Sequence, residues 1–188
     1  MIKFSSQVPK LGMKFLGVKY GKNMKLVGWP FVFKFPGSEI TIGDNCCVNS
    51  SFMSNLLGLH QRTILVARYG GKITIGNNVG MSGVTIYSWN KINIGDNTLI
   101  GANTKIIDTD FHPIDSEMRK KNEFSGIKTA PINIGTNVFV GCEVIITKGT
   151  NIGNNCVIGA GSVVHGTFGD NVVIAGNPAK VIRTLENN

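Results

Sequence analysis

The chain of 188 residues is long enough for one domain with a substantial hydrophobic core. Its 16% charged and 42% hydrophobic residues exclude a disordered chain, and its 24 glycines favour an all-β fold with many tight turns. The formal net charge of +8 indicates either an anionic partner, such as a phosphate-bearing molecule, or simply a basic soluble protein. Because no DNA- or RNA-binding motif accompanies this charge, we expect no nucleic acid partner.

The N-terminal residues 1–17 show no repeat, and we predict that they form an irregular lead-in to a single domain spanning 1–188. The first ten residues, MIKFSSQVPK, contain no long apolar segment, and no run in the chain approaches the roughly 18 apolar residues that span a bilayer. The four cysteines form no C-x-x-C pair, which is the pattern of unpaired thiols in a reducing compartment. We therefore expect a cytoplasmic protein without stable membrane insertion.

Aromatic residues alternate with other residues in the stretch that follows. They are Trp29, Phe31, Phe33 and Phe35. Since alternate side chains of a strand point to one face, this stretch is predicted to be a strand whose aromatic face packs in the core or against another subunit, in preference to forming a sugar platform.

A short motif then recurs along the chain, in which an apolar residue is followed by glycine, a small polar residue and asparagine. Gly and Asn suit tight turns because both tolerate left-handed backbone conformations. Weaker copies lie at 21–23 and 101–103. The six good copies are Ile42-Gly43-Asp44-Asn45, Ile75-Gly76-Asn77-Asn78, Ile94-Gly95-Asp96-Asn97, Ile134-Gly135-Thr136-Asn137, Ile152-Gly153-Asn154-Asn155 and Phe168-Gly169-Asp170-Asn171.

Between these turns the aliphatic residues recur every six residues, which is neither the 3.6 of a helix nor the 2 of a simple strand. Three such steps make one 18-residue coil, as the spacing of Ile134 and Ile152 shows. Successive coils are expected to stack by parallel strand pairing at about 4.8 Å and to bury a continuous core. The in-phase positions are Ile94, Ile100, Ile106, Ile134, Val140, Ile146, Ile152, Ile158 and Val164.

Two segments interrupt the repeat. Residues 54–70 separate two of the turn copies, and residues 113–131 separate Ile106 from Ile134. The second segment is polar and basic and is bounded by prolines, so we predict that it projects from the solenoid as a loop, where function often lies. His60, in the first interruption, is interpreted as a solvated loop residue.

His112 is the strongest catalytic candidate. It lies six residues after Ile106, in phase with the core positions, at the head of the predicted loop. A neutral imidazole with a pKa near 6.5 can take the proton of an alcohol as the oxygen attacks a carbonyl. Asp110 and Asp115 are near enough in sequence to orient it, although Asp-rich turns are often only solvated.

Two further segments complete a resemblance to a known family. Residues 159–164 read GAGSVV and residues 175–183 read AGNPAKVIR, and His112 lies in the stretch DTDFHPID. With the hexapeptide repeat over roughly 18–183, the chain resembles the left-handed parallel β-helix acyltransferases. It is most similar to the maltose, galactoside, nodulation-factor and surface-polysaccharide O-acetyltransferases.

The resemblance implies direct transfer from acetyl-CoA to a sugar hydroxyl of a surface-polysaccharide precursor or sugar nucleotide, with His112 as general base. It implies a homotrimer with each active site between neighbouring subunits. The C-terminal segment, about 159–188, would hold the cofactor. The resemblance implies that the amide of Cys142 stabilises the oxyanion of the reacting carbonyl. It also implies that Ala160, His165 and Gly166 contact the pantetheine arm of the cofactor, and that Lys180 and Arg183 bind its phosphates.

One position departs from the family. Maltose-type relatives carry an acceptor-binding Asn about 30 residues before the base, whereas this sequence has Ser82 in that region, which puts the acceptor's identity in doubt. Cys142 is not expected to be a nucleophile, because the sequence shows no partner that would lower its pKa.

Alternatives remain. An N-acetyltransferase acting on an amino sugar would use the same machinery, and a non-catalytic β-helix trimer would need no base at all. A γ-class carbonic anhydrase shares the fold but needs closely spaced zinc-binding histidines. His60, His112 and His165 are each more than fifty residues apart, so we expect no metal site.

Overall fold

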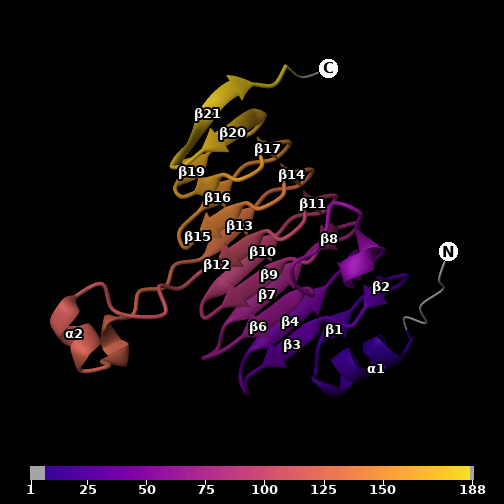
Figure 1. The fold of residues 1–188 in the computed structure, drawn as a ribbon, viewed down its shortest axis with the longest axis horizontal. Helices are drawn as coiled ribbons and strands as arrows, with labels where there is room; N and C mark the ends of the chain where they lie inside the picture. The colour runs from indigo at the N-terminus through magenta and orange to yellow at the C-terminus, as the bar shows by residue number, and fades with distance from the viewer. Residues whose placement is uncertain (1–6, 187–188) are drawn as a thin grey trace.

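The computed structural model describes residues 7–186, so the ends of the predicted lead-in and of the cofactor segment, 1–6 and 187–188, lie outside the described residues. The chain winds through three sheets, here called A, B and C, and each strand pairs in parallel with the strand one coil later (Figure 1). Sheet A contains β1 (Lys19–Tyr20), β4 (Glu39–Ile42), β7 (Lys72–Ile75), β10 (Lys91–Ile94), β13 (Ile132–Ile134), β16 (Asn151–Ile152) and β19 (Thr167–Phe168).

In each coil the chain passes from sheet A to sheet B and then to sheet C. Sheet B contains β2 (Lys25–Gly28), β5 (Cys47–Ser50), β8 (Gly80–Ser82), β11 (Leu99–Ile100), β14 (Phe139–Val140), β17 (Val157–Ile158), β20 (Val172–Gly176) and β21 (Ala179–Thr184). Sheet C contains β3 (Phe31–Lys34), β6 (Ile64–Ala67), β9 (Thr85–Ser88), β12 (Lys105–Ile107), β15 (Ile145–Thr147) and β18 (Val163–Val164). We call the turns between them the AB, BC and CA corners. The predicted parallel β-helix is confirmed.

The recurring turn motif forms the AB corner. The asparagine of every good copy has a left-handed φ of 56–58°, as the sequence predicted. These asparagines also bond one another from coil to coil, for example Asn78 Nδ2 to Asn97 Oδ1 at 3.0 Å. The glycine is needed for close approach, because a Cβ on Gly95 would lie 2.5 Å from the backbone of Gly135.

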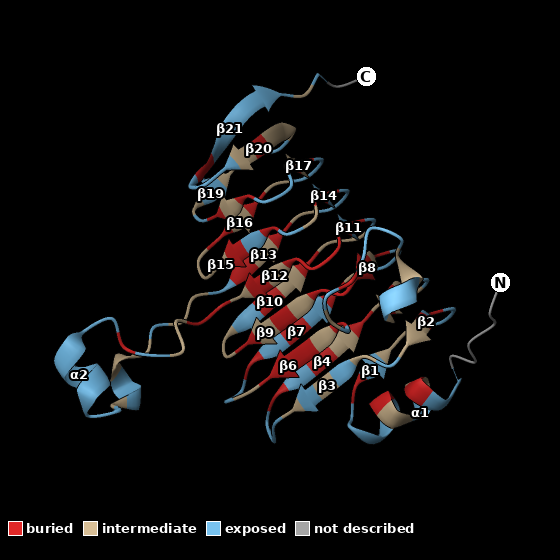
Figure 2. Cartoon of the chain, viewed as in Figure 1, coloured by how far each residue is buried: buried red, intermediate tan, exposed pale blue. Residues whose placement is uncertain are grey.

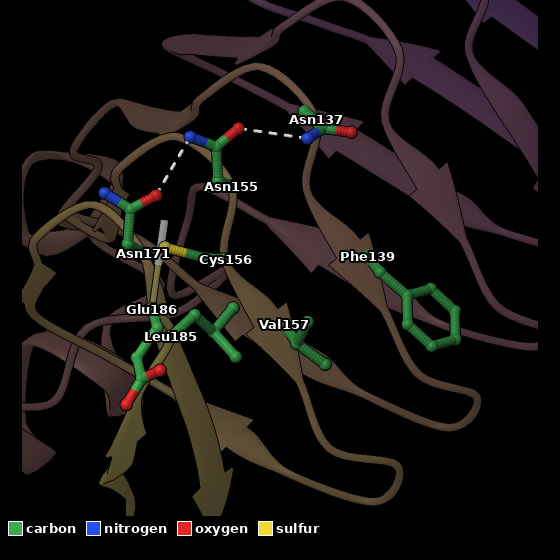
Figure 3. A pocket seen from close by; sticks show the side chains of 8 residues that line it. All are labelled: Asn137, Phe139, Asn155, Cys156, Val157, Asn171, Leu185 and Glu186. Atoms are coloured by element: carbon green, nitrogen blue, oxygen red, sulfur yellow. Dashed lines mark hydrogen bonds between the residues drawn. The ribbon is translucent and has the colours of Figure 1, made fainter. Parts of the chain in front are cut away.

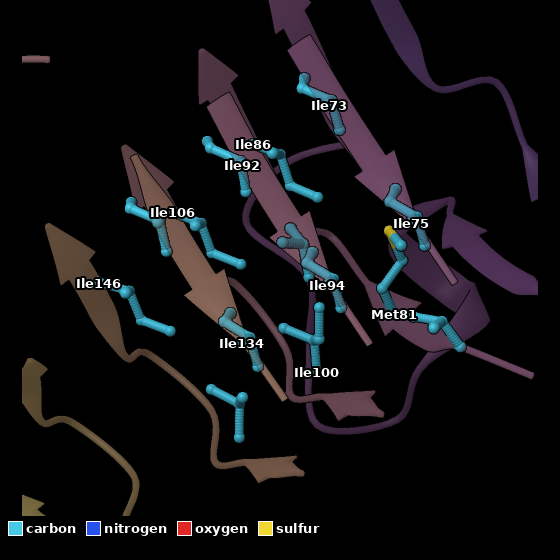
Figure 4. Close-up of a cluster of buried hydrophobic side chains, with 14 of the residues drawn as sticks. Ile73, Ile75, Met81, Ile86, Ile92, Ile94, Ile100, Ile106, Ile134 and Ile146 are labelled. Carbon is cyan, nitrogen blue, oxygen red and sulfur yellow. The ribbon is translucent and has the colours of Figure 1, made fainter. Parts of the chain in front are cut away.

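Stacked aliphatic side chains fill the prism (Figure 4), and Figure 2 shows buried residues along the strands of successive coils. In sheet C, Ile106 is aligned with Ile86 on one side and Ile146 on the other, and all three are fully buried. All nine aliphatic positions predicted from the six-residue period are buried, so that prediction is confirmed.

Two parts of the sequence interpretation were wrong. The predicted irregular lead-in contains α1 (Gln7–Phe15), which buries Met13 against the end of the prism and is followed by Gly17 with a φ of +73°. Residues 64–67, predicted to interrupt the repeat, form β6 inside sheet C. The first interruption is therefore residues 51–63, at the BC corner, and contains the short 3₁₀ helix η1 (Phe52–Ser54).

The second interruption leaves the prism at the CA corner. It occupies the chain between β12 and β13 and contains α2 (Ser116–Lys120) and η2 (Phe124–Gly126), which project well away from the sheets in Figure 1. Its two arms pair briefly, since Thr109 bridges Thr129 in antiparallel fashion.

The C-terminal end is closed by the antiparallel pair of β20 and β21. The four cysteines are unpaired, as predicted, and burial raises the pKa of the Cys46 and Cys156 thiols. None of the helices within residues 7–186 has the length and apolar character to cross a membrane.

Candidate functional site

His112 lies at the CA corner, at the base of the projecting loop. Its side chain is exposed, so the hexad phase does not carry it into the core as the spacing with Ile106 suggested. The reason is that β12 ends at Ile107 and the chain turns outward, with Phe111 in a left-handed conformation at a φ of +61°. The His112 amide donates to the Asp110 carbonyl at 2.7 Å, which fixes the backbone, and within residues 7–186 the exposed imidazole has no hydrogen-bond partner.

The two carboxylates near His112 are both engaged elsewhere in this chain. Asp110 Oδ1 forms an ion pair with Lys148 Nζ at 2.7 Å, and both side chains are at least three-quarters buried. Asp115 caps α2, because its Oδ1 accepts from the Met118 amide at 2.9 Å. The sequence did not indicate Lys148, which lies directly after β15 at the same corner.

A third carboxylate, Asp108, organises the corner from inside. It is fully buried and accepts hydrogen bonds from the Ser88 hydroxyl at 2.6 Å and from the Trp89 and Asn90 amides at 2.7 and 3.0 Å. Burial raises its pKa, against the opposing effect of these hydrogen bonds. Asp108 therefore fixes the turn after β9 that carries Trp89.

The predicted cofactor residues His165 and Gly166 lie at the same CA corner, on the C-terminal side of His112. They follow β18, and His165 Nδ1 lies 3.3 Å from Thr147 Oγ1 and 3.1 Å from the Lys148 carbonyl oxygen. Only one ring nitrogen of His165 is occupied by these contacts.

Ser82, Cys142 and Ala160 lie at the BC corner instead. Ser82 is nearly buried and accepts from Asn49 Nδ2 at 3.1 Å. The amides of Gly141 and Glu143 donate within the prism, whereas no hydrogen bond among residues 7–186 uses the Cys142 amide. The Ala160 amide is left free in the same way, between Gly159 and Gly161, which both donate.

A polar cluster at this corner was not predicted. His60 Nε2 lies 3.0 Å from Glu143 Oε1, and the same oxygen accepts from Asn103 Nδ2 at 2.8 Å. Asn103 also accepts from the His60 amide at 3.0 Å and donates to the Gly58 carbonyl at 3.2 Å. Asn103 thereby ties the first interruption to the prism, and His60 is paired and not merely solvated.

The remaining predicted residues, Lys180 and Arg183, lie exposed on β21 in sheet B. A hollow of about 650 Å³ lies near this end of the molecule, over the AB corner (Figure 3). It is lined by the ladder of Asn137, Asn155 and Asn171 and contains none of the predicted site residues. No three His, Cys, Asp or Glu side chains gather into a possible metal site anywhere in residues 7–186.

Within one chain, the predicted site residues other than Asp115, Lys180 and Arg183 are thus divided between the two edges of sheet C. The CA edge carries His112, Asp110, His165 and Gly166, and the BC edge carries Ser82, Cys142 and Ala160. A three-residue strand separates the edges by about 10 Å. His112 and the Cys142 amide therefore do not meet around one small group in a single subunit.

Comparisons with known proteins agree with the repeat and the fold. A model described as the hexapeptide repeat of succinyl-transferase matches residues 91–107 and 131–165. Galactoside O-acetyltransferase of Escherichia coli strain K12 is 43% identical over 118 residues, covering 62% of this chain and 56% of that protein. The WbbJ protein of the same strain, named for O-acetyl transfer in lipopolysaccharide biosynthesis, is 33% identical over 168 residues, covering 86% of this chain and 80% of that protein.

Among solved structures, a galactoside acetyltransferase in complex with coenzyme A matches with a TM-score of 0.61 and 29% identity, covering 98% of this chain and 74% of that chain. The chain spans less than two thirds of the length of the first curated relatives that it matches.

Proposed function

Because this chain belongs to the hexapeptide-repeat, left-handed β-helix acyltransferase family, we propose that it transfers an acetyl group from acetyl-CoA to a sugar hydroxyl, with His112 as general base. The relatives support the reaction class, since two are named for O-acetyl transfer and one was solved with coenzyme A. The observation that carries the proposal is the exposed imidazole at the base of the projecting loop, which no group in the described part of the chain engages.

In the proposed reaction, the neutral imidazole of His112 accepts the hydroxyl proton while the sugar oxygen forms a bond to the thioester carbonyl carbon. The carbon–sulfur bond then breaks, and the imidazolium returns its proton to the departing thiolate. No acyl-enzyme is required. A free backbone amide beside the carbonyl would stabilise the developing negative oxygen, and the unpaired Cys142 amide suits that role.

The donor would lie along the C-terminal coils. The free Ala160 amide and the partly free ring of His165 are available to the pantetheine arm, beside Gly166. The exposed cations Lys180 and Arg183 suit its phosphates. These residues lie on separate edges of the prism, so they can surround one donor only if two subunits contribute.

A homotrimer would supply this composite site, with the CA edge of one subunit facing the BC edge of the next. The outer faces support it. Sheets B and C expose large apolar side chains such as Phe139 at 50%, Phe31 at 46% and Phe33 at 42%. Sheet A instead shows polar ladders, such as Asn93 to Asn133 at 2.7 Å. Sheets B and C are therefore the faces that a neighbouring subunit would cover.

The acceptor is proposed to be a sugar of a surface-polysaccharide precursor, a choice that the WbbJ relative supports. Ser82 would contact it from the BC edge, and Asp110 would support His112 through the backbone bond and the Lys148 ion pair. Asp115 acts through the cap of α2 at the head of the loop.

The direct test is thiol release from acetyl-CoA in the presence of a panel of sugars, amino sugars and sugar nucleotides. His112→Ala should lower the rate by at least about 10², the usual scale for losing a general base. Calorimetric binding of acetyl-CoA to this variant should be unchanged, which shows that the site is still folded. Full activity in the variant would reject the role of His112, and exclusive use of amines would move the reaction to N-acetylation.

The composite site has its own test. His112→Ala removes the CA-edge base, and Ala160→Glu places bulk and charge on the exposed BC-edge donor position. When equal amounts of the two inactive proteins are unfolded together and refolded, about one quarter of all sites in the randomly assembled trimers combine two intact edges. Activity should return to about that fraction. A mixture that stays inactive, or a protein that is monomeric by light scattering, would contradict the shared site.

A further inference from the structure

An aromatic surface occupies the CA corner on the N-terminal side of His112. Phe35, Tyr69, Trp89 and Phe111 each follow a successive strand of sheet C. Their ring centroids lie 5.8 Å apart for Phe35 and Tyr69, 4.6 Å for Tyr69 and Trp89, and 6.3 Å for Trp89 and Phe111. Three coil steps of about 4.8 Å give this aromatic ladder a length of about 14 Å.

The projecting loop extends the ladder. Phe124 of η2 lies parallel to the Trp89 ring at 6.2 Å and edge-on to Tyr69 at 5.9 Å. Phe35, Tyr69 and Phe124 remain 39%, 45% and 64% exposed, and Trp89 and Phe111 are partly buried, so solvent reaches every ring of the surface. The loop that begins at His112 thus ends by adding a ring to the surface beside it.

Polar groups hold the rings in place. Asp108 fixes the backbone of Trp89, and the Arg68 guanidinium lies 4.8 Å over the Tyr69 ring while donating to its hydroxyl at 2.8 Å. Three buried side-chain atoms without a hydrogen-bond partner occur in residues 7–186, and all three lie here: Arg68 Nε, Trp89 Nε1 and Asp110 Oδ2. Buried polar atoms that lack a hydrogen-bond partner are expected more often at functional sites than elsewhere in a protein.

The order of the coils along the CA corner assigns this surface to the acceptor. Lys148 and His165 follow the two strands on the C-terminal side of His112, where the proposed donor lies. The ladder lies on the opposite side of the imidazole. An acceptor whose hydroxyl meets His112 must therefore extend away from the donor, over Trp89 and toward Tyr69 and Phe35.

We propose that the aromatic ladder is an extended binding surface for an acceptor glycan longer than one sugar ring, with the ring nearest His112 acetylated. This inference rests on the proposed acetyl transfer and deepens it. A pyranose ring has an apolar face that packs on aromatic rings and hydroxyls that suit the polar rim of Arg68 and the Tyr69 hydroxyl. A surface of about 14 Å exceeds what one ring can cover.

The test compares acceptors of increasing length. Thiol release is measured with methyl glucoside, maltose and maltotriose and with methyl galactoside, galactobiose and galactotriose, for the wild type, Tyr69→Ala and Phe35→Ala. Phe15→Ala, in the 88% exposed position of α1, is the matched aromatic control. In one of the series, kcat/KM should rise with length, and Tyr69→Ala should lower it by about tenfold for three rings and much less for one. Phe15→Ala should change neither.

A second measurement does not need turnover. The chain has 2 tryptophans, so Trp29→Phe leaves Trp89 as the sole fluorophore. Its emission should respond to the three-ring sugars and much less to the methyl glycosides, and Tyr69→Ala should remove the difference.

The outcomes separate the two proposals. If His112→Ala is as active as the wild type, or no sugar releases thiol, the proposed function fails. If acetyl transfer occurs but Tyr69→Ala acts equally on one and three rings, the ladder proposal alone fails. Loss of the trimer in Tyr69→Ala would make the ladder a subunit contact and would also overturn the proposal, as would Trp89 emission that shows no dependence on sugar length.

Discussion

Asn103 offers a sharp test of how the first interruption is held to the prism. Its side chain is nearly buried and takes part in three hydrogen bonds, with the His60 amide, the Gly58 carbonyl and the Glu143 carboxylate. Removing all three in Asn103→Ala should cost about 1 kcal/mol each, because Glu143 is half-exposed and its charge adds little. The left-handed φ of +62° adds about 1 kcal/mol for alanine.

Asn97 provides the matched control. It has nearly the same backbone conformation, with a φ of +58°, but within residues 7–186 its exposed side chain takes part in a single hydrogen bond, from Asn78 at 3.0 Å. Asn97→Ala therefore suffers the same backbone cost and the loss of one bond. The free energy of unfolding should fall by about 4 kcal/mol for Asn103→Ala and by about 2 kcal/mol for Asn97→Ala.

Urea unfolding of both variants at one protein concentration measures this difference, since the stability of an oligomer depends on concentration. Hydrogen exchange over residues 51–63 reports whether the loss is local, and only Asn103→Ala should speed it. Equal destabilisation of the two variants, with unchanged exchange in the interruption, would refute the assignment of Asn103 as its anchor.

Three further changes probe the prism and the CA corner. Burial raises the pKa of Asp108 above 3.8, so the folded state binds a proton at this carboxyl more tightly than the unfolded state does. The contribution of Asp108 to stability is therefore largest below pH 3.8 and falls as the pH rises through the raised pKa. In urea titrations, the stability of the wild type relative to Asp108→Asn should grow as the pH is lowered from 7 towards 4. Ile106→Ala should lose about 2–5 kcal/mol and Ile106→Val about 1 kcal/mol by the same method, because the site is fully buried between aligned neighbours. Lys148→Gln should leave the mostly buried Asp110 carboxylate without its cation and so shift the pH–rate profile of acetyl transfer. Lys148→Arg keeps the positive charge and should restore the wild-type profile.

The regular part of the fold could be predicted because its information is local. Each turn copy specifies its own left-handed asparagine, and each six-residue step places one aliphatic side chain inside. The bounds of β6 could not be found in this way, because Ile64–Ala67 is followed by Arg68 and Tyr69 in place of the turn motif. The helix α1 was missed because Pro9 and Gly12 weaken its propensity, and the packing of Met13 stabilises it instead.

The candidate site was predicted only in part. Sequence context singled out His112, which the structure places exposed at the base of the loop, and its catalytic role stays a prediction. The His60–Asn103–Glu143 cluster joins residues 43 and 40 positions apart, so it becomes visible only when the lengths of both interruptions are known. The same holds for the ion pair of Asp110 with Lys148, which spans the whole projecting loop.

The three corners of the prism differ in a way that links sequence regularity to function. All six good copies of the turn motif lie at the AB corner, where asparagines repeat the same conformation and the same ladder of bonds. At the BC corner the left-handed position is filled in turn by Gly83, Asn103, Glu143 and Gly161, and at the CA corner by residues as unlike as Tyr69 and Phe111. Both interruptions, and every predicted site residue outside β21, lie at these two irregular corners. A corner whose only task is to turn the chain can use one solution in every coil, whereas a corner that contacts a ligand or a neighbouring subunit needs a different side chain at each level.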